Sequence, residues 1–378
     1  MFLPDHIREN SRRIVVKIGS SLLVDEAKGS IKQKWLCHLG EDIQWLIEHN
    51  RQVLIVSSGA IALGRGRLGL DKARLSLPEK QAAAAAGQAV LIQSYENALM
   101  PHGLTTAQAL LSLSDTENRR GWLNARATLD TLLGLGAVPV INENDTVATE
   151  EIRYGDNDRL AARVAQMCSA DLLVLLSDID GLYDKDPHQH SDARFIARVD
   201  KLTPDIMAMG GEANSLRGTG SGGMATKLQA ARIATSAGCA LAITKGETDN
   251  PLRKLLQGQT RATWFAPQTD VLTARKRWIA GQIKPSGSLH IDAGALTALQ
   301  NGKSLLAVGV TCVDGTFSKG DTVRILGPDK SEIGMGLVAY DADSARLIKG
   351  VNSADIEKHL GYNGEAILIH RDNMVIHS

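Results

Sequence analysis

Short runs of β-branched and other apolar residues alternate with helical stretches through the first two-thirds of this 378-residue chain. Because strands that are joined through helices run in the same direction, this alternation predicts an α/β fold, a mainly parallel sheet sandwiched between helices. The predicted strands span residues 13–18, 52–56, 105–113, 137–141, 171–176 and 240–244. The predicted helices span residues 34–49 and 78–100, and two more begin at residue 59 and near residue 224.

The sequence changes character after Thr263, Trp264 and Phe265. A basic stretch that contains proline and glycine follows, and beyond it the apolar runs are shorter and separated by turn residues, as in a small β-rich domain. These later runs lie at residues 307–313, 321–325, 334–340 and 366–369. We therefore predict a first domain over residues 11–266, a linker over residues 267–279 and a β-rich second domain over residues 280–376.

Composition excludes some classes of protein. Lys+Arg and Asp+Glu both number 42, so a net charge of zero gives no general attraction to nucleic acid or membranes. The four cysteines are scattered without a C-x-x-C pair, which argues against a disulfide framework or a zinc site and is typical of a reducing cytoplasm. No apolar run is long enough to span a bilayer, and the first 13 residues lack a secretory signal. We expect a cytoplasmic protein with no membrane partner.

Polar side chains follow four of the predicted strands, at the point where each strand ends. In parallel sheets ligands bind beyond the carboxyl ends of the strands, so these positions predict one shared site. They are Lys17, Ser57 with Ser58, residues 142–145 (Asn-Glu-Asn-Asp) and Ser177 with Asp178. Ser58 also precedes a predicted helix whose N-terminus can hold a carboxylate or phosphate, although a plain capping serine explains it equally well.

Two segments have the features of a phosphate-binding site. Lys17 is followed by Gly19 and two serines, so an ammonium group and backbone N–H groups can meet phosphate oxygens together. In residues 218–227 the glycines allow close backbone approach, and the helix starting near Met224 directs its positive end toward the same place. Lys227 lies one turn into that helix, within reach of a transferring group. A solvated lysine at a strand end and a flexible surface loop are the alternatives.

Two acidic clusters, residues 142–145 and 155–158, lie close together in the sequence. Asp145 suits the ammonium group of an amino acid, and Asp158 suits a position between two active-site lysines. Asn, Asp and Gly also favour turns, which is the structural alternative. Phosphoryl transfer depends mainly on positioning and charge neutralisation, and two lysines, a carboxylate cluster and two glycine-rich segments are what it requires. The chain is therefore predicted to be a small-molecule kinase.

Other catalytic patterns are missing from the sequence. It has neither the G-x-x-x-x-G-K-[ST] loop nor the H-R-D and D-F-G motifs of protein kinases. Residues 64–69 match G-x-G-x-x-G but do not follow a strand, so they are weak support for dinucleotide binding. No histidine has the H-E-x-x-H spacing of a metal site, and we expect no metal ligand from the protein.

Taken in order, the segments resemble the amino acid kinase family, over residues 12 to 265. The most specific of them is residues 138–145, and the start of the chain is shared more widely in the family. The segments are V-V-K-I-G-S-S (15–21), S-S-G-A-I-A (57–62), V-P-V-I-N-E-N-D (138–145), G-D-N-D (155–158), S-D-x-x-G-L-Y (177–183) and S-G-G-M-A-T-K (221–227). Serine replaces the usual threonine at Ser57, Ser177 and Ser221, which keeps the hydroxyl group and loses a methyl group. The C-terminal part resembles a PUA domain.

The resemblance implies roles for individual residues. Lys17 and Lys227 would stabilise the charge on the transferring phosphoryl group, and Asp158 would organise these two lysines. The acceptor would be bound by Ser58, Asp145 and Asn157. ATP would be bound by Lys17, Ser177, Asp178, Ser221, Gly222, Gly223, Met224, Ala225, Thr226 and Lys227. ATP is the implied co-substrate, with Mg²⁺ held mainly by the nucleotide phosphates.

The resemblance also implies a reaction, the phosphorylation of the L-glutamate side-chain carboxylate to γ-glutamyl phosphate at the start of proline synthesis. It implies a homo-oligomer (dimer or tetramer), inhibition by proline and a reductase that receives the labile product. One alternative is a sibling kinase for N-acetylglutamate, aspartate, carbamate or a nucleoside monophosphate. An acidic Asp145 fits a free α-amino group better than an N-acetyl or phosphate group. Another is an RNA-binding PUA protein with an inert kinase-like part, which the intact Lys17, Asp158 and Lys227 argue against.

Overall fold

The computed structural model of this chain describes residues 4–25, 28–70, 75–112, 115–116, 118–147, 156–211, 223–269, 285–364 and 366–376. The chain divides into two compact units. One comprises Met1–Glu117 and Asn124–Val271, and the other comprises Asn118–Leu123 and Leu272–Ser378. All described residues of the predicted site belong to the first unit. None of the described helices combines the length and apolarity needed to cross a membrane.

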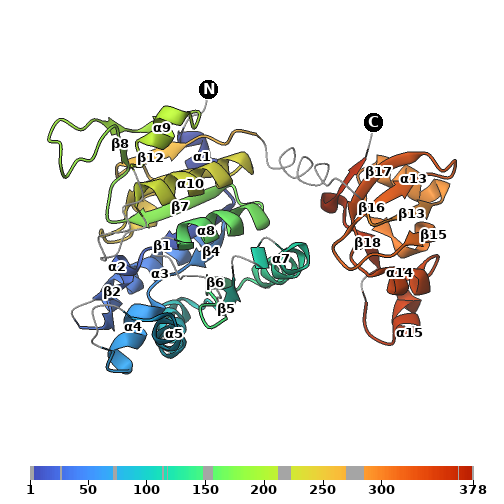
Figure 1. The fold of residues 1–378 in the computed structure, drawn as a ribbon, viewed down its shortest axis with the longest axis horizontal. Helices are drawn as coiled ribbons and strands as arrows, with labels where there is room; N and C mark the ends of the chain where they lie inside the picture. The colour runs from blue at the N-terminus through green and yellow to red at the C-terminus, as the bar shows by residue number, and fades with distance from the viewer. Residues whose placement is uncertain are drawn as a thin grey trace. The chain divides into compact units, whose positions relative to one another are not determined.

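An eight-stranded sheet forms the centre of the first unit (Figure 1). Its strands are β1 (Arg13–Ile18), β4 (Gln52–Val56), β5 (Thr106–Leu111), β6 (Val138–Glu143), β7 (Leu172–Ser177), β10 (Arg198–Val199), β11 (Ala240–Lys245) and β12 (Ala262–Phe265). The strand order is β10-β12-β11-β7-β1-β4-β6-β5, and every neighbouring pair is parallel except β11 with β12. Two short ribbons pair β2 (Val24–Asp25) with β3 (Ser30–Ile31) and β8 (Leu182–Tyr183) with β9 (Phe195–Ile196). The predicted mainly parallel sheet is confirmed.

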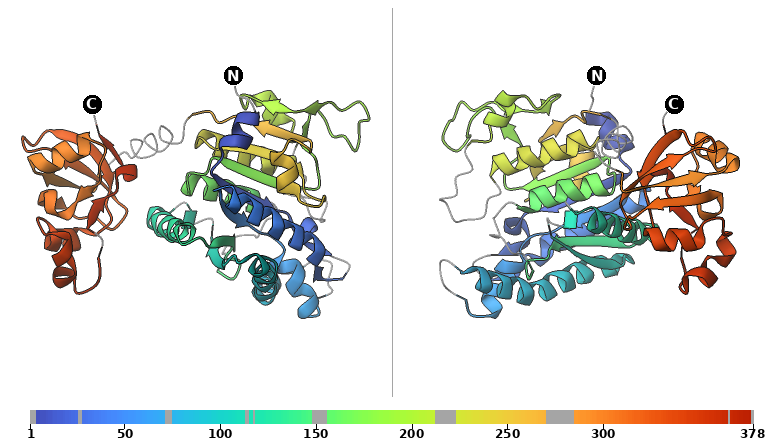
Figure 2. Two further views of the ribbon diagram at one scale, coloured as in Figure 1. Left: turned by 180° about the vertical axis from the view of Figure 1, so that it is seen from behind. Right: turned by 45° about the vertical axis from the view of Figure 1, so that its right-hand side comes forward.

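Helices cover both faces of this sheet. They are α1 (Pro4–Asn10), α2 (Ser20–Leu23), α3 (Gln33–Glu48), α4 (Ala60–Arg67), α5 (Leu77–Leu99), the 3₁₀ turn η1 (Met100–His102), α7 (Arg119–Gly134), α8 (Asp156–Met167), α9 (Pro204–Ala208), α10 (Met224–Ser236) and α11 (Pro251–Leu256). Helices α8 and α10 pack side by side on one face (Figure 1). Helices α3 and α5 lie on the other face, where α3 is seen in blue from behind (Figure 2).

The alternation of side chains along β1 assigns its residues to the two faces. Ile14, Val16 and Ile18 belong to the hydrophobic core that includes buried residues of α3 and α5. Since successive side chains of a strand point to opposite faces, Val15 and Lys17 must point toward α8 and α10. Burial of the whole strand on both faces explains its nearly continuous β-branched sequence.

Helix α5 is anchored at its start and packed closely against α4. Ser76 and Glu79 form a capping box at its first turn, with Glu79 accepting from the Ser76 backbone N–H at 2.9 Å. Further along, Gly87 faces α4 so closely that a Cβ atom there would lie 1.8 Å from the Ala60 carbonyl oxygen. Glycine at this position therefore allows the two helices to pack backbone to backbone.

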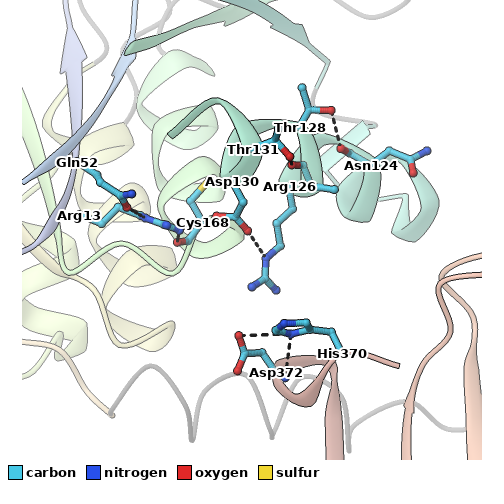
Figure 3. A network of polar contacts seen from close by, with 11 residues as sticks. Arg13, Gln52, Asn124, Arg126, Thr128, Asp130, Thr131, Cys168, His370 and Asp372 are labelled. Carbon is cyan, nitrogen blue, oxygen red and sulfur yellow. Dashed lines mark hydrogen bonds and ion pairs between the residues drawn. The ribbon is translucent and has the colours of Figure 1, made fainter. Parts of the chain in front are cut away.

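A network of polar contacts ties the start of β1 to its neighbours (Figure 3). The Arg13 guanidinium donates to Asp130 of α7 at 2.8 Å and to Gln52 of β4 at 2.9 Å, and also to the Cys168 carbonyl oxygen. Arg126 approaches the other oxygen of Asp130 at 3.3 Å. This network lies at the amino end of the strand, the end opposite Lys17.

The second unit is a smaller mixed structure. Its strands are β13 (Gly287–Ile291), β14 (Leu305–Leu306), β15 (Val310–Gly315), β16 (Thr322–Leu326), β17 (Glu332–Leu337), β18 (Ile367–Ile369) and β19 (Met374–Ile376). Its helices are α13 (Ala293–Gln300), η2 (Ala307–Gly309), α14 (Ala342–Ile348), η3 (Ser353–Asp355), α15 (Ile356–Leu360) and η4 (Arg371–Asn373). Five strands form a sheet in the order β15-β13-β16-β17-β19, and this unit has its own core.

Several elements differ from the sequence-based expectation. The sequence analysis placed no strand at β12 or β13, although β13 lies inside the second sheet, and it described the second domain as β-rich without locating its helices. Both strands are short, and their pairing depends on distant partners that no local pattern reveals. Most of the predicted linker, from residue 270 onward, lies outside the described residues, and the predicted domain boundaries stay a prediction.

Candidate active site

The predicted site residues gather around the carboxyl ends of the central strands. Lys17 is the last but one residue of β1, the middle strand of the group β7, β1 and β4. Its side chain points to the face that α8 and α10 cover, and the residue is only 7% exposed. A buried ammonium group must be paired, because an uncompensated charge in the interior is costly.

Asp158 provides the partner for Lys17 and also for Lys227. This carboxylate on the first turn of α8 is fully buried, and its two oxygens face different lysines. Lys17 Nζ lies 2.6 Å from Oδ1, and Lys227 Nζ of α10 lies 3.2 Å from Oδ2. Burial alone raises the pKa of Asp158, but the charges and hydrogen bonds of the two lysines outweigh it and hold the pKa below its ordinary value. The carboxylate is therefore ionised, and the three groups together carry one positive charge.

The first turn of α10 adds further polar contacts. The Thr226 hydroxyl lies 3.1 Å from Asp158 Oδ2 and 2.8 Å from the Gly223 carbonyl oxygen. Gly223 precedes α10, and the first N–H groups of an α-helix have no acceptor within the helix, so they point out of its start. Such a helix start favours anions, and here it lies beside Lys227. Gly223, Met224 and Ala225 are thus placed at this helix start, whereas Ser221 and Gly222 lie outside the described residues.

A second group of contacts links the start of α8 to the end of β4. Asn157 Nδ2 donates to Ser58 Oγ at 2.8 Å and to the Ser57 carbonyl oxygen at 3.2 Å. A carbonyl oxygen can only accept, so the amide NH₂ group faces β4 and Asn157 Oδ1 faces away. Among the residues that the structure describes, that buried oxygen has no hydrogen-bond partner. Gly59 follows with φ of +105°, a conformation that other residues rarely adopt, and allows α4 to begin directly after the strand.

Asp145 lies just beyond β6, and its carboxylate is buried. The residue is 8% exposed, and burial raises its pKa to about 6. Within the described part of the chain, no cation or hydrogen-bond donor offsets this burial. A buried carboxylate of this kind is stabilised when a ligand brings a positive charge to it.

Ser177 and Asp178 close the end of β7. Ser177 is buried and its hydroxyl donates to Asp178 Oδ1 at 2.8 Å, whereas Asp178 itself is exposed. Lys245, at the end of the next strand β11, forms an ion pair with Glu247 at 2.9 Å. Because β7 is the parallel neighbour of β1, Ser177 and Asp178 lie at the same sheet edge as Lys17.

Two residues on the other face of the sheet were missed by the sequence analysis. Tyr95 of α5 is fully buried and its hydroxyl lies 2.9 Å from Ser57 Oγ. Gln88, two turns earlier on the same helix, accepts from Asn142 Nδ2 at 2.8 Å. Their spacing of seven residues puts both on one helix face. This spacing could have indicated in the sequence that Gln88 and Tyr95 act together. However, it is equally typical of ordinary core packing, and no neighbouring residue in the sequence indicates that the two side chains support strand ends.

The structure thus brings together Lys17, Asp158, Thr226 and Lys227, and links Asn157, next to Asp158, with Ser58. Among the described residues, no hydrogen bond or ion pair joins Asp145 to this group, and Asp145 lies two residues beyond the end of β6, the neighbour of β4. Chemically, the site offers two fixed ammonium groups, a helix start that favours anions, and a separate buried carboxylate. This combination can bring two anionic groups together and hold the ammonium group of one of them.

The chain is similar to two known families and to several individual proteins. The model of the amino acid kinase family matches residues 12–245, and the PUA domain model matches residues 287–360. Glutamate 5-kinase of Rhodopseudomonas palustris (strain BisB18) is 56% identical over 368 residues, which cover 97% of each chain. Glutamate 5-kinase of Dinoroseobacter shibae is 55% identical over 366 residues, covering 97% of this chain and 98% of the relative. Glutamate 5-kinase of Paramagnetospirillum magneticum is 56% identical over 366 residues, with the same coverage.

Proposed function

The chain belongs to the amino acid kinase family, and we propose that it transfers the γ-phosphoryl group of ATP to the side-chain carboxylate of L-glutamate. The products are γ-glutamyl phosphate and ADP, and the reaction is the first step of proline biosynthesis. One observation carries the proposal most directly: the fully buried Asp158 holds two ammonium groups at the carboxyl edge of the sheet, beside the start of α10. Near-full-length similarity to glutamate 5-kinases supports the choice of substrate.

The chemistry requires charge neutralisation rather than proton removal. An oxygen of the glutamate γ-carboxylate forms a bond to the γ-phosphorus while the bond to the ADP oxygen breaks. At neutral pH this carboxylate is already ionised, so no general base is needed. Lys17 and Lys227 offset the repulsion between the two anions, and Asp158 fixes both ammonium groups before the substrates arrive.

Mg²⁺ would accompany ATP and would be held mainly by its phosphate oxygens. Magnesium prefers oxygen ligands in octahedral geometry and often keeps several waters, so substrate phosphates can supply most of its coordination. Asp158 already contacts two lysines, which makes it a poor metal ligand. When bound, Mg²⁺ would add positive charge at the phosphates.

The unpaired groups of the site suit an α-amino acid. In the described part of the chain, Asp145 is buried without a cation and Asn157 Oδ1 is buried without a donor, so both would be satisfied by an ammonium group. Ser58 and the start of α4 offer donors for the α-carboxylate. N-acetylglutamate, carbamate and a nucleoside monophosphate lack the ammonium group. Aspartate has the ammonium group, but its side chain is one methylene group shorter. Its side-chain carboxylate, the phosphoryl acceptor, would therefore not reach the two lysines.

The test is a hydroxylamine-trapping assay with ATP and Mg²⁺, run in parallel on L-glutamate, N-acetylglutamate and L-aspartate. Hydroxylamine converts an acyl phosphate into a stable hydroxamate, so product and substrate are identified together. We expect hydroxamate from L-glutamate alone. Hydroxamate mainly from N-acetylglutamate would contradict the assigned role of Asp145, and no hydroxamate from any acid would contradict the proposed reaction.

We also propose the domain division given by the sequence: a catalytic domain over residues 11–266, a linker over 267–279 and a PUA domain over 280–376. The two compact units and the two matched segments support this division. A homo-oligomer, cytoplasmic location and transfer of the labile product to a reductase remain proposals that rest on the family. Light scattering coupled to gel filtration would test the first of these by measuring the molar mass in solution.

A further inference from the structure

In the second unit, a histidine, a cysteine and an aspartate meet on two neighbouring strands. His290 of β13 is paired directly with Cys312 of the antiparallel strand β15, and Asp314 lies two residues beyond Cys312. One candidate ligand atom from each residue lies within 4.8 Å of the others. No other group of three such residues at this spacing occurs among the residues that the structure describes.

Strand alternation explains why the three side chains share a face. Leu289, Ile291 and Val313 point into the core of the second unit. The residues between and beside them, His290, Cys312 and Asp314, therefore point away from that core. Residues directly opposite on antiparallel strands have Cβ atoms about 4.5–5.5 Å apart, which brings His290 and Cys312 within reach of one ion.

Asp314 makes contact with both of the other groups. Its Oδ2 lies 2.7 Å from His290 Nε2, and its Oδ1 accepts from Cys312 Sγ at 3.6 Å. These contacts are made through a hydrogen on nitrogen and a hydrogen on sulfur, and a metal cation can occupy the place of both hydrogens. We propose that His290, Cys312 and Asp314 form a binding site for a divalent transition-metal cation of the Zn²⁺ type.

The ligand types determine which cation fits. Thiolate and imidazole groups suit Zn²⁺, and related ions such as Co²⁺, whereas Mg²⁺ and Ca²⁺ prefer oxygen ligands alone. Three protein ligands leave one tetrahedral position for water. Strand β15 is the edge strand of its sheet, and Asp314 is exposed, so the ion can enter from solvent.

Binding is linked to proton release. The Cys312 thiol loses its proton to solvent and binds as the thiolate. A neutral His290 ring, whose proton lies on Nε2 in the contact with Asp314, changes to the tautomer protonated on Nδ1 and binds through Nε2. Asp314 binds as the carboxylate. Arg346 lies nearby, but it is paired with Asp343 at 2.8 Å and donates to the Gly315 carbonyl oxygen, so its charge is partly offset.

The sequence analysis argued against a zinc site because no C-x-x-C pair is present. The spacing rule detects only ligands that are close in the sequence, whereas His290 and Cys312 are brought together by strand pairing. The ion would connect β13 with the edge strand β15 and so stabilise the second unit. The site takes no part in the phosphoryl-transfer chemistry proposed above.

The experiment uses the full-length chain after treatment with a chelator. Zn²⁺ is titrated against a chromophoric indicator, and Co²⁺ is titrated in parallel to observe its visible absorption and its sulfur-to-metal charge-transfer band. We expect one tight equivalent per chain, a cobalt spectrum with the thiolate band, and an affinity more than about 100-fold weaker in Cys312→Ser and His290→Gln. Cys37→Ser is the matched control, since Cys37 is an exposed free thiol on α3, and it should bind like the wild type.

Two results would overturn the site. One is the absence of a tight equivalent in the wild type, and the other is a tight equivalent that survives in Cys312→Ser or His290→Gln. Melting curves of the metal-free variants establish that each is folded, which is expected because the three side chains point away from the core. If Cys312→Ser does not fold, Asp314→Asn provides the same comparison.

Discussion

A network of charged side chains lies at each end of β1, and the two networks differ in burial and in what they can bind. At the amino end, Arg13 pairs with Asp130, and these side chains remain 22% and 35% exposed. At the carboxyl end, Lys17 pairs with Asp158, and these are 9% and 0% exposed. Arg13 and Lys17 lie four residues apart on β1, so one strand connects a partly exposed cluster with a buried one.

The difference shows what each network can contribute. The Arg13 cluster is satisfied by protein groups, since its guanidinium donates to Asp130, Gln52 and the Cys168 carbonyl oxygen. Among the described residues, the Lys17 cluster places two lysines around one buried carboxylate. Two ammonium groups held side by side attract an anion, so the first network is suited to holding the fold and the second to binding phosphate.

Asp158→Asn should have the largest effect, because it leaves two buried ammonium groups without their counter-charge. We expect a loss of about 3–5 kcal/mol in the free energy of unfolding, measured with denaturant, together with loss of activity. Because phosphates can replace the missing charge, ATP should raise the melting temperature of this variant more than that of the wild type. Unchanged stability would contradict the description of Asp158 as the centre of a buried network.

Lys227→Met should act mainly on turnover, since Asp158 keeps Lys17 as a partner. Loss of one fixed charge that stabilises the transition state lowers kcat by about 10²–10³-fold. Lys201→Met is the control, because Lys201 is exposed and should leave kcat unchanged. Near-normal turnover of Lys227→Met in the hydroxamate assay would exclude the role assigned to this lysine.

Asp145→Asn should raise the KM for glutamate by about 10–100-fold with a smaller effect on kcat, because the lost charge pairs with the substrate ammonium group. Burial raises the pKa of Asp145 to about 6, so the wild type should lose kcat/KM for glutamate as the pH falls below 6 and the carboxylate is protonated. The plot of kcat/KM against pH for Asp145→Asn should lack this fall at acidic pH, the acidic limb of the profile.

Asp42→Asn is the matched control for this pH dependence. Burial also raises the pKa of Asp42 to about 6, but this carboxylate accepts from the Leu252 backbone N–H at 2.7 Å, at the start of α11. The acidic limb should therefore persist in Asp42→Asn. If the acidic limb disappeared in Asp42→Asn and survived in Asp145→Asn, it would report the protonation of Asp42 and would contradict the role of Asp145.

Asp130→Asn should have the smallest effect and should act on stability alone. It weakens the contacts of Arg13 and Arg126, and for partly exposed groups we expect a loss of about 1–2 kcal/mol in the free energy of unfolding. kcat and both KM values should stay within about twofold of the wild type when the assay is run well below the melting temperature. A large fall in kcat would show that the two ends of β1 are coupled.

Much of the first unit could be predicted because its pattern is local. A strand buried on both faces is almost continuously apolar, and the polar residue that ends it is therefore conspicuous, as with Lys17 after two valines and Ser177 after a run of leucines. The second unit was harder to predict. Strand β13 is short and is defined by pairing with β15 and β16, which lie later in the chain.

The sequence by itself determined the alternating α/β organisation, the strand ends that carry polar groups, and the family. These follow from residue order, because the periodicity of apolar residues and the presence of a chemical group are local properties. The sequence also suggested that Asp158 lies between Lys17 and Lys227, and the tertiary structure supplied the distances. Only the tertiary structure decided that Tyr95 and Gln88 support strand ends from the opposite face, and that His290 meets Cys312. Each of these depends on distances between residues far apart in the chain, and such distances are set by strand register and helix packing.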